Sequence, residues 1–116
     1  MRHQMKKVTL DRKAAPRRAL LCGLVSSLVL YEKITTTKAK AKAIKPLIEK
    51  AITKAKKNDL ANRRALLAQL HAKNVVSKLI EVLGPRYTTR QGGYTRIVNL
   101  GNRKGDGAQE VVIEFV

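Results

Sequence analysis

An α+β fold, with about four helices packed on a small antiparallel sheet, is predicted by three features of this 116-residue sequence. Apolar residues recur at helical spacing over the first two-thirds of the chain. Short segments rich in β-branched residues, separated by glycine-containing loops, follow in the last third. The hydrophobic fraction is 44% but the aromatic fraction is only 3%, so we expect an aliphatic core.

The chain has the length of one domain, and its first residues form a basic arm ahead of the globular part. Residues 1–14 are polar and without periodicity. We expect them to order against RNA phosphates, although a frayed terminus is the alternative. Residues 15–116 are expected to form a single globular α+β domain. The apolar run Ala19–Leu30 follows basic residues as in a signal peptide, but no small-residue cleavage site comes after it. It is also shorter than the roughly 20 residues that span a bilayer.

The first helix and the first strand are indicated by local signals. Pro16 suits the first turn of a helix, where its missing N–H costs nothing, and apolar residues recur through Leu28. Glu32–Thr37 is short and rich in β-branched residues, as in a strand. Thr37 can then cap a second helix over Lys38–Lys57.

The second helix combines an apolar stripe with a row of lysines. Pro46 lies inside the pattern and predicts a kink. The lysine row is either an ordinary solvated face or, on a chain this basic, a ridge that faces RNA. The stripe consists of Ile44, Leu47, Ile48, Ala51, Ile52 and Ala55, and the lysines roughly opposite are Lys38, Lys42, Lys45 and Lys56.

Two more helices and a hairpin complete the expected fold. Asn58-Asp59 predicts a stop and a new cap, followed by a helix over 60–71. Asn74 is expected to cap a fourth helix, which Gly84-Pro85 should end. Segments 94–100 and 109–116 should pair as an antiparallel hairpin around the basic loop 101–107, with 32–37 as a possible third strand. Inward positions are Leu60, Leu67 and Leu70 on the third helix and Val75, Val76, Leu79, Ile80 and Leu83 on the fourth.

Charge is the strongest functional signal. The chain has 25 Lys and Arg against 8 Asp and Glu, a formal net charge of +17. So much like charge opposes a compact state, and a polyanion would relieve it. Nucleic acid is favoured over a membrane surface or an acidic protein. Residues 1–57 carry 16 basic and 3 acidic side chains, so this half is expected to be the main electrostatic face.

No catalytic or metal-binding pattern is visible. The single cysteine, Cys22, can form no internal disulfide and is interpreted as a small buried hydrophobe. One cysteine with the distant His3 and His71 does not make a zinc site. The acids are dispersed, which argues against a two-metal nuclease. We therefore expect no enzymatic activity, metal, cofactor or small-molecule substrate, although residues far apart in sequence can meet in a fold.

Residues 84–96 combine arginine, tyrosine and glycine. Guanidinium forks pair with phosphate oxygens, tyrosine can stack on an unpaired base, and glycine lets the backbone approach a phosphate. The alternative is a Gly-rich turn whose tyrosines belong to the core. The candidate RNA contacts in this segment are Arg86, Tyr87, Arg90, Gly92, Gly93, Tyr94 and Arg96.

The blocks Gly84–Tyr87 and Arg90–Ile97 resemble the hallmark of the L-seventeen family of bacterial-type large-subunit ribosomal proteins. Other blocks agree in order and spacing, over nearly the whole chain. They are Met1-Arg2-His3, Thr36–Ala41, Asn62–Arg64, Gly105-Asp106 and Ile113-Glu114.

The resemblance implies an α+β protein of the cytoplasmic ribosome without catalytic residues or cofactors. Its implied partners are large-subunit ribosomal RNA, near the exit of the nascent-peptide tunnel, and neighbouring ribosomal proteins, with no membrane. A small RNA-processing enzyme and a DNA-compacting protein remain the alternatives. By position, the resemblance implies RNA contacts at Arg2, His3, Arg12, Arg17, Lys38, Arg63, Arg64, Arg86, Arg90, Gly93, Tyr94 and Arg96. Charge and composition add further candidate contacts at Lys6, Lys7, Arg18, Lys42, Tyr87, Gly92, Arg103 and Lys104.

Overall fold

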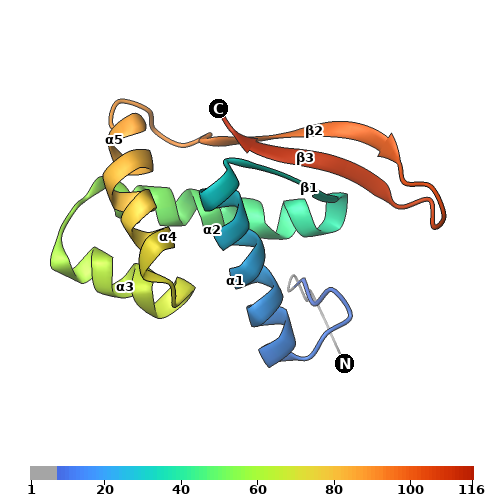
Figure 1. Ribbon diagram of the computed structural model, residues 1–116, viewed down its shortest axis with the longest axis horizontal. Helices are drawn as coiled ribbons and strands as arrows, with labels where there is room; N and C mark the ends of the chain where they lie inside the picture. Colours follow the sequence, from blue (N-terminus) through green and yellow to red (C-terminus); the bar gives the residue numbers. More distant parts are fainter. Residues whose placement is uncertain (1–7) are drawn as a thin grey trace, which may run out of the picture.

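A computed structural model describes residues 8–116 of the chain. The RNA contacts expected at Arg2, His3, Lys6 and Lys7 lie outside these residues. The α+β class is confirmed (Figure 1). The elements are α1 (Ala14–Tyr31), β1 (Lys33–Thr37), α2 (Lys38–Lys56), α3 (Leu60–Leu70), α4 (Lys73–Lys78), the π-helical turn η1 (Leu79–Leu83), α5 (Gly84–Arg86), β2 (Thr95–Asn102) and β3 (Gln109–Phe115).

The three strands form one antiparallel sheet in the order β1-β3-β2. The predicted hairpin of β2 and β3 is confirmed. The predicted third strand is also confirmed, since β1 pairs with β3, the central strand of the sheet. Ile113 of β3 is opposite Ile34 on one side and Ile97 on the other. In Figure 1 the helices lie on one side of the sheet, with α2 running beneath it.

The core is aliphatic, as composition predicts, and α2 is its centre. Ile44, Ile48 and Ile52 are fully buried in a cluster that includes residues of α1, α3, α4 and β3. Fully burying one such side chain stabilises the fold by about 1.5–3 kcal/mol. The predicted stripe is confirmed except that Leu47 is only partly buried. Among residues 8–116, no helix is both long and apolar enough to cross a bilayer.

The helix boundaries follow the predicted caps at some positions and not at others. Asp59 caps α3 as predicted, because its Oδ1 accepts a hydrogen bond from the Asn62 N–H at 2.8 Å. Thr37 is the N-cap residue of α2, but its side chain makes no capping hydrogen bond. The cap predicted at Asn74 is wrong, since α4 begins at Lys73 after Ala72.

The inward positions of α3 were predicted only in part. Leu60 is 61% exposed, which contradicts its expected place in the core. The inward position of Leu70 is confirmed, Leu67 is partly buried against the core, and Leu66, which was not predicted, is buried. Residues four apart share one helical face, and Leu60, in the first turn, is off that face.

The helix after α3 does not end at Gly84-Pro85, so that prediction is wrong. α4, η1 and α5 form one helical run from Lys73 to Arg86. In η1 the Gly84 N–H donates to the Leu79 carbonyl, five residues earlier. This wider turn shifts the hydrogen-bond register by one residue. It accommodates Pro85, which has no N–H and would clash with the carbonyl four residues back in a regular α-helix.

Gly84 also lies close against the backbone of α2. A Cβ atom added at Gly84 would lie 2.7 Å from the backbone oxygen of Ala55. A backbone oxygen cannot move aside as the end of a flexible side chain can. Gly84 therefore permits the backbone contact that fixes the start of the segment 84–96.

We expect Gly84→Ala to lower the free energy of unfolding by about 1–3 kcal/mol, because the added methyl group overpacks this contact. Gly23→Ala is the matched control, since a Cβ at Gly23 in α1 meets nothing within 4 Å. The control should stabilise by about 0.5–1 kcal/mol through helix propensity. Urea denaturation of both variants measures the difference, and equal stabilisation would contradict the close approach at Ala55.

Candidate nucleic-acid interface

The tyrosines of the segment 84–96 belong to the core. Tyr87 is 3% exposed and Tyr94 is 2% exposed. Their ring centroids are 5.2 Å apart with a tilt of 55°, and Phe115 lies 6.4 Å from Tyr87. The prediction that Tyr87 and Tyr94 stack on RNA bases is therefore wrong for this conformation, because both rings are covered by protein. The alternative of core tyrosines is confirmed.

Hydrogen bonds tie the same segment to the end of β3. The Tyr87 hydroxyl donates to the backbone oxygen of Val116 at 2.8 Å. The Val116 N–H donates to the Tyr94 backbone oxygen at 2.9 Å. Two points of the segment are thus held against the last residue of the chain, which leaves the arginines between and beside them on the surface.

Lys56 of α2, which was predicted on the lysine row, has its amino group engaged by atoms of the protein. Its Nζ donates to the Arg90 backbone oxygen at 2.7 Å and to the Tyr94 hydroxyl oxygen at 3.1 Å. It also lies 5.4 Å from the centroid of the Tyr94 ring. Hydrogen bonds from the Gly92 backbone and then from Lys56 lower the pKa of Tyr94 below its ordinary value.

The glycines shape the turn between the two tyrosines. Gly92 and Gly93 have φ values of 73° and 61°, in the left-handed region that favours glycine. The Arg90 Nε donates to the Gly93 backbone oxygen at 3.1 Å, which closes the turn. Both glycines are exposed, so their backbone stays open to a ligand.

Three of the predicted arginine contacts form ion pairs that sequence patterns did not reveal. Arg86 pairs with Glu32, and Arg96 Nε lies 2.9 Å from Glu114 Oε1. All of these side chains are partly exposed, so the pairs contribute little stability but do orient the guanidinium groups. The third pair joins Arg103 to Asp106.

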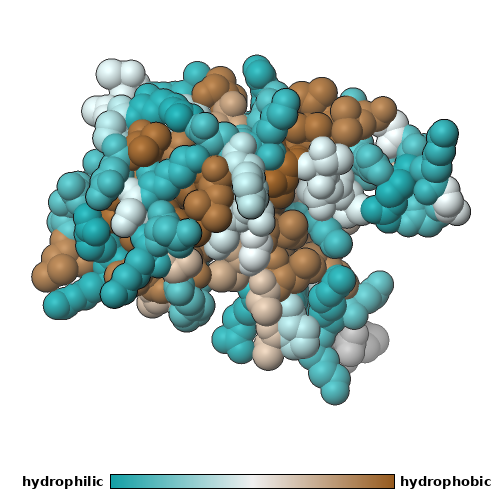
Figure 2. Space-filling model, in the orientation of Figure 1, coloured by the Kyte–Doolittle hydropathy of each residue, from teal (hydrophilic) through white to brown (hydrophobic). Residues whose placement is uncertain are grey.

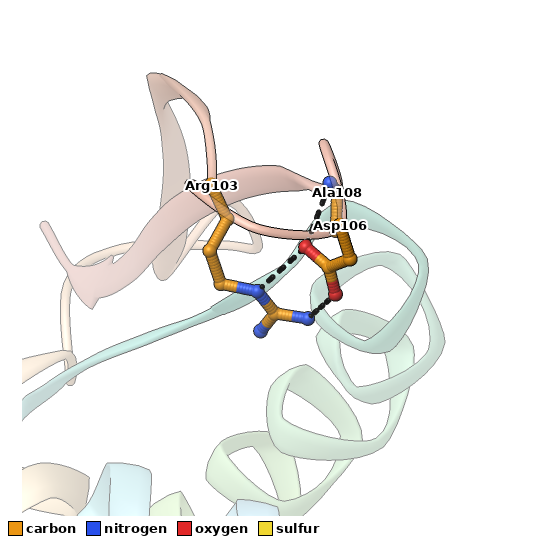
Figure 3. A network of polar contacts seen from close by, with 3 residues as sticks. All are labelled: Arg103, Asp106 and Ala108. Atoms are coloured by element: carbon orange, nitrogen blue, oxygen red, sulfur yellow. Dashed lines mark hydrogen bonds and ion pairs between the residues drawn. The ribbon is translucent and has the colours of Figure 1, made fainter.

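The third pair lies in the loop between β2 and β3 (Figure 3). Arg103 Nε donates to Asp106 Oδ1 at 3.1 Å, and the Ala108 N–H donates to the same oxygen at 3.1 Å. These contacts lower the pKa of Asp106 to about 2, and the hydrogen bond from Arg103 has the largest effect. The basic tip is thereby partly neutralised, while Lys104 stays exposed and forms no ion pair with a described residue.

The predicted contacts on the helical layer differ in accessibility. Arg12, Arg18, Lys42 and Arg64 are exposed, and Lys38 and Arg63 are half-buried. None of these six forms an ion pair with another described residue. In Figure 2, hydrophilic side chains cover much of the helical layer.

Arg17 is the exception among the helical cations. It is only 9% exposed, and its Nη1 donates to the Arg12 backbone oxygen at 3.3 Å. It fastens the segment before α1 to the helix. The expected RNA contact at Arg17 is therefore not available in this conformation.

The row of lysines on α2 is rotated relative to the prediction. Lys45 and Lys56 are half-buried at the flank of the apolar stripe. Lys42, Lys50 and Lys54 are exposed, and the last two were missed. A helical wheel at about 100° per residue places Lys50 farther from the buried isoleucines than Lys45, so a measured wheel would have identified it.

Within residues 8–116, no three His, Cys, Asp or Glu side chains gather to hold a metal ion. Cys22 is half-buried, with its Sγ 3.4 Å from the Leu70 backbone oxygen. The arrangement offers exposed cations on a packed helical layer and an arginine-containing turn that is held by hydrogen bonds. Such groups can neutralise phosphates.

We expect Lys56→Met to lower the free energy of unfolding by about 1–2 kcal/mol, because two hydrogen bonds from a charged group are lost. Lys54→Met is the matched control, since Lys54 lies on the same helix and its side chain is exposed to solvent. Thermal and urea unfolding of both variants measure the effect. Equal stability of the two would show that Lys56 does not anchor the turn.

The titration of Asp106 offers a second test. Because its pKa is lowered to about 2 from 3.8, the stabilisation by the Arg103 pair is present above pH 3.8 and is lost as pH falls through about 2. NMR titration of the Asp106 carboxyl should give a midpoint near 2. In Arg103→Gln the midpoint should rise toward 3.8. An unchanged midpoint would exclude Arg103 as the main cause.

Comparison with known proteins gives the same family over the whole chain. Residues 20–116 match the family described as Ribosomal protein L17. The large ribosomal subunit protein bL17 of Hydrogenobaculum sp. is 50% identical, with 100% of this chain and 99% of the relative aligned. The proteins of the same name from Syntrophotalea carbinolica and Hyphomonas neptunium are 46% and 47% identical over 100% of this chain, and 75% and 83% of their own lengths. The chain belongs to the ribosomal protein L17 family.

Proposed function

We propose that this chain is a structural constituent of the large ribosomal subunit in the cytoplasm, where it binds and stabilises folded ribosomal RNA without catalysing a reaction. Membership of a ribosomal protein family and identity along the full length of relatives named as large-subunit proteins support this assignment. The family resemblance of the blocks at 84–97 supports a position near the exit of the nascent-peptide tunnel.

The exposed cations of the helical layer are the observation that carries RNA binding. Lys42, Lys50 and Lys54 project from α2, whose opposite face is fixed in the core. No described carboxylate neutralises them. Phosphates can do so and release condensed counterions, which supplies a large part of the binding free energy.

The turn at 84–96 adds oriented donors to this layer. A guanidinium group has five N–H donors, and Arg90 uses one of them within the turn. Arg86 is held by Glu32 and is partly exposed. Their remaining donors and the exposed backbone of Gly92 and Gly93 can contact phosphates without further ordering of the segment.

Sedimentation tests the assignment to the particle. An epitope-tagged chain in its own cells should be recovered in the large-subunit fractions of a sucrose gradient, and should stay there when low magnesium separates the subunits. Recovery only in the soluble top fractions would overturn the assignment. Site-specific cleavage of ribosomal RNA by the pure protein with magnesium would favour an enzyme instead.

The salt dependence of RNA binding tests the mechanism. If Lys42 contacts a phosphate, Lys42→Gln should weaken binding and reduce the slope of log affinity against log salt by about 1. Lys33→Gln is the control, because Lys33 is exposed on β1 and the charge change is equal. Filter binding to protein-free large-subunit RNA between roughly 50 and 200 mM salt gives both slopes.

Equal slope changes in the two variants would show that binding responds to total charge and not to the helical layer. Duplex DNA serves as competitor in the same assay. If DNA displaces the RNA with equal affinity, a DNA-compacting role is favoured over the proposed one.

A further inference from the structure

The net positive charge of the chain lies outside the sheet. The sheet with its connecting loop, residues 32–37 and 95–116, has no net charge, so the whole formal excess of +17 lies in the rest of the chain. Four basic side chains, Lys33, Arg96, Arg103 and Lys104, are balanced by four acidic ones, Glu32, Asp106, Glu110 and Glu114.

The side of the sheet that faces away from the helices carries apolar side chains. Val111 and Ile113 of β3 are fully buried toward the helices. Because successive side chains of a strand alternate, Val112 points to the opposite face, together with its partners Val98 on β2 and Thr35 on β1. In Figure 1 no helix lies on that side of the sheet, within the residues that the structure describes.

We call Thr35, Val98, Leu100 and Val112 the outer sheet patch. Val98 is 44% exposed and Leu100, at the bulge in β2, is 55% exposed. Figure 2 shows hydrophobic side chains along this edge of the molecule, above the sheet. The patch is small, but it is continuous across the strands and no other described element covers it.

RNA does not fit the outer sheet patch. Its aliphatic side chains offer no donor to a phosphate, and covering them with RNA would desolvate phosphates without pairing them. The charged side chains on this face are two carboxylates, Glu110 and Glu114, and two cations, Lys33 and Arg96, so the face has no net charge to attract a polyanion. Glu114 is already paired with Arg96, whereas Glu110 has no ion-pair partner among the described residues.

A protein surface fits the same features. Protein interfaces have an apolar centre and a polar rim of mixed charge. We propose that the outer sheet patch docks a neighbouring protein of the large subunit, a basic protein that presents aliphatic side chains to Val98 and Leu100 and a lysine or arginine to Glu110. This inference rests on the proposed function, because it needs the ribosomal particle as the setting.

Site-specific photo-cross-linking tests the proposal. The full chain, with a photoreactive residue in place of Val98, is assembled into large subunits in cells, and the purified subunits are irradiated. We expect an adduct with a ribosomal protein, located by mass spectrometry beside aliphatic residues and a lysine or arginine. The same residue in place of Lys42 should form an adduct with ribosomal RNA.

The outcomes separate the two proposals. An adduct of position 98 with RNA or with a second copy of this chain, or no adduct at all, would overturn the docking proposal while position 42 still reports RNA. If position 42 forms no RNA adduct, the proposed RNA-binding layer is wrong whatever position 98 shows.

A charge-neutral variant gives an independent readout. Val98→Gln with Leu100→Gln removes the apolar centre at exposed positions and leaves the net charge unchanged. We expect affinity for protein-free RNA to be unaltered, while retention in large subunits after a high-salt wash falls by about tenfold. Circular dichroism checks the fold, and full retention would contradict a protein contact at this patch.

Discussion

Repulsion among 25 lysines and arginines in a chain of 116 residues is the constraint on which the rest of the structure depends. A compact state is possible only if these charges stay apart from one another and outside the core. The aliphatic centre built on Ile44, Ile48 and Ile52 meets this requirement, since it places the α2 lysines on the opposite face or at its flank. The neutral sheet then packs on a helical layer that carries most of the excess charge.

The turn between α5 and β2 shows how the two layers are joined. Gly84 lets the helical run approach α2, and Lys56 extends from α2 to hold Arg90 and Tyr94. Tyr87 connects the same turn to the end of β3. Lys56, a cation of the helical layer, thus anchors the turn to α2. The arginines of the turn lie at the border between the charged helical layer and the neutral sheet.

The sequence predicts those features that depend on strong local signals. Asp59 and the β-branched segment near residue 35 could be identified because a capping carboxylate and a short β-branched run each favour one local structure. The helix through Pro85 was not predicted, since a π-type turn depends on tertiary packing at Gly84. Tyr87 and Tyr94 were ambiguous because a tyrosine serves equally as a core residue or as a stacking platform, and only burial decides.

Because the excess charge lies outside the sheet, RNA should shield the lysines of the two layers unequally. Lysine acetylation, read by mass spectrometry with and without protein-free large-subunit RNA, reports each amino group separately. We expect RNA to protect Lys42, Lys50 and Lys54 of α2 and to leave Lys33 of the sheet as reactive as in the free protein. Equal protection of Lys33, or no protection on α2, would contradict the claim that the α2 lysines, and not the sheet, face the phosphates.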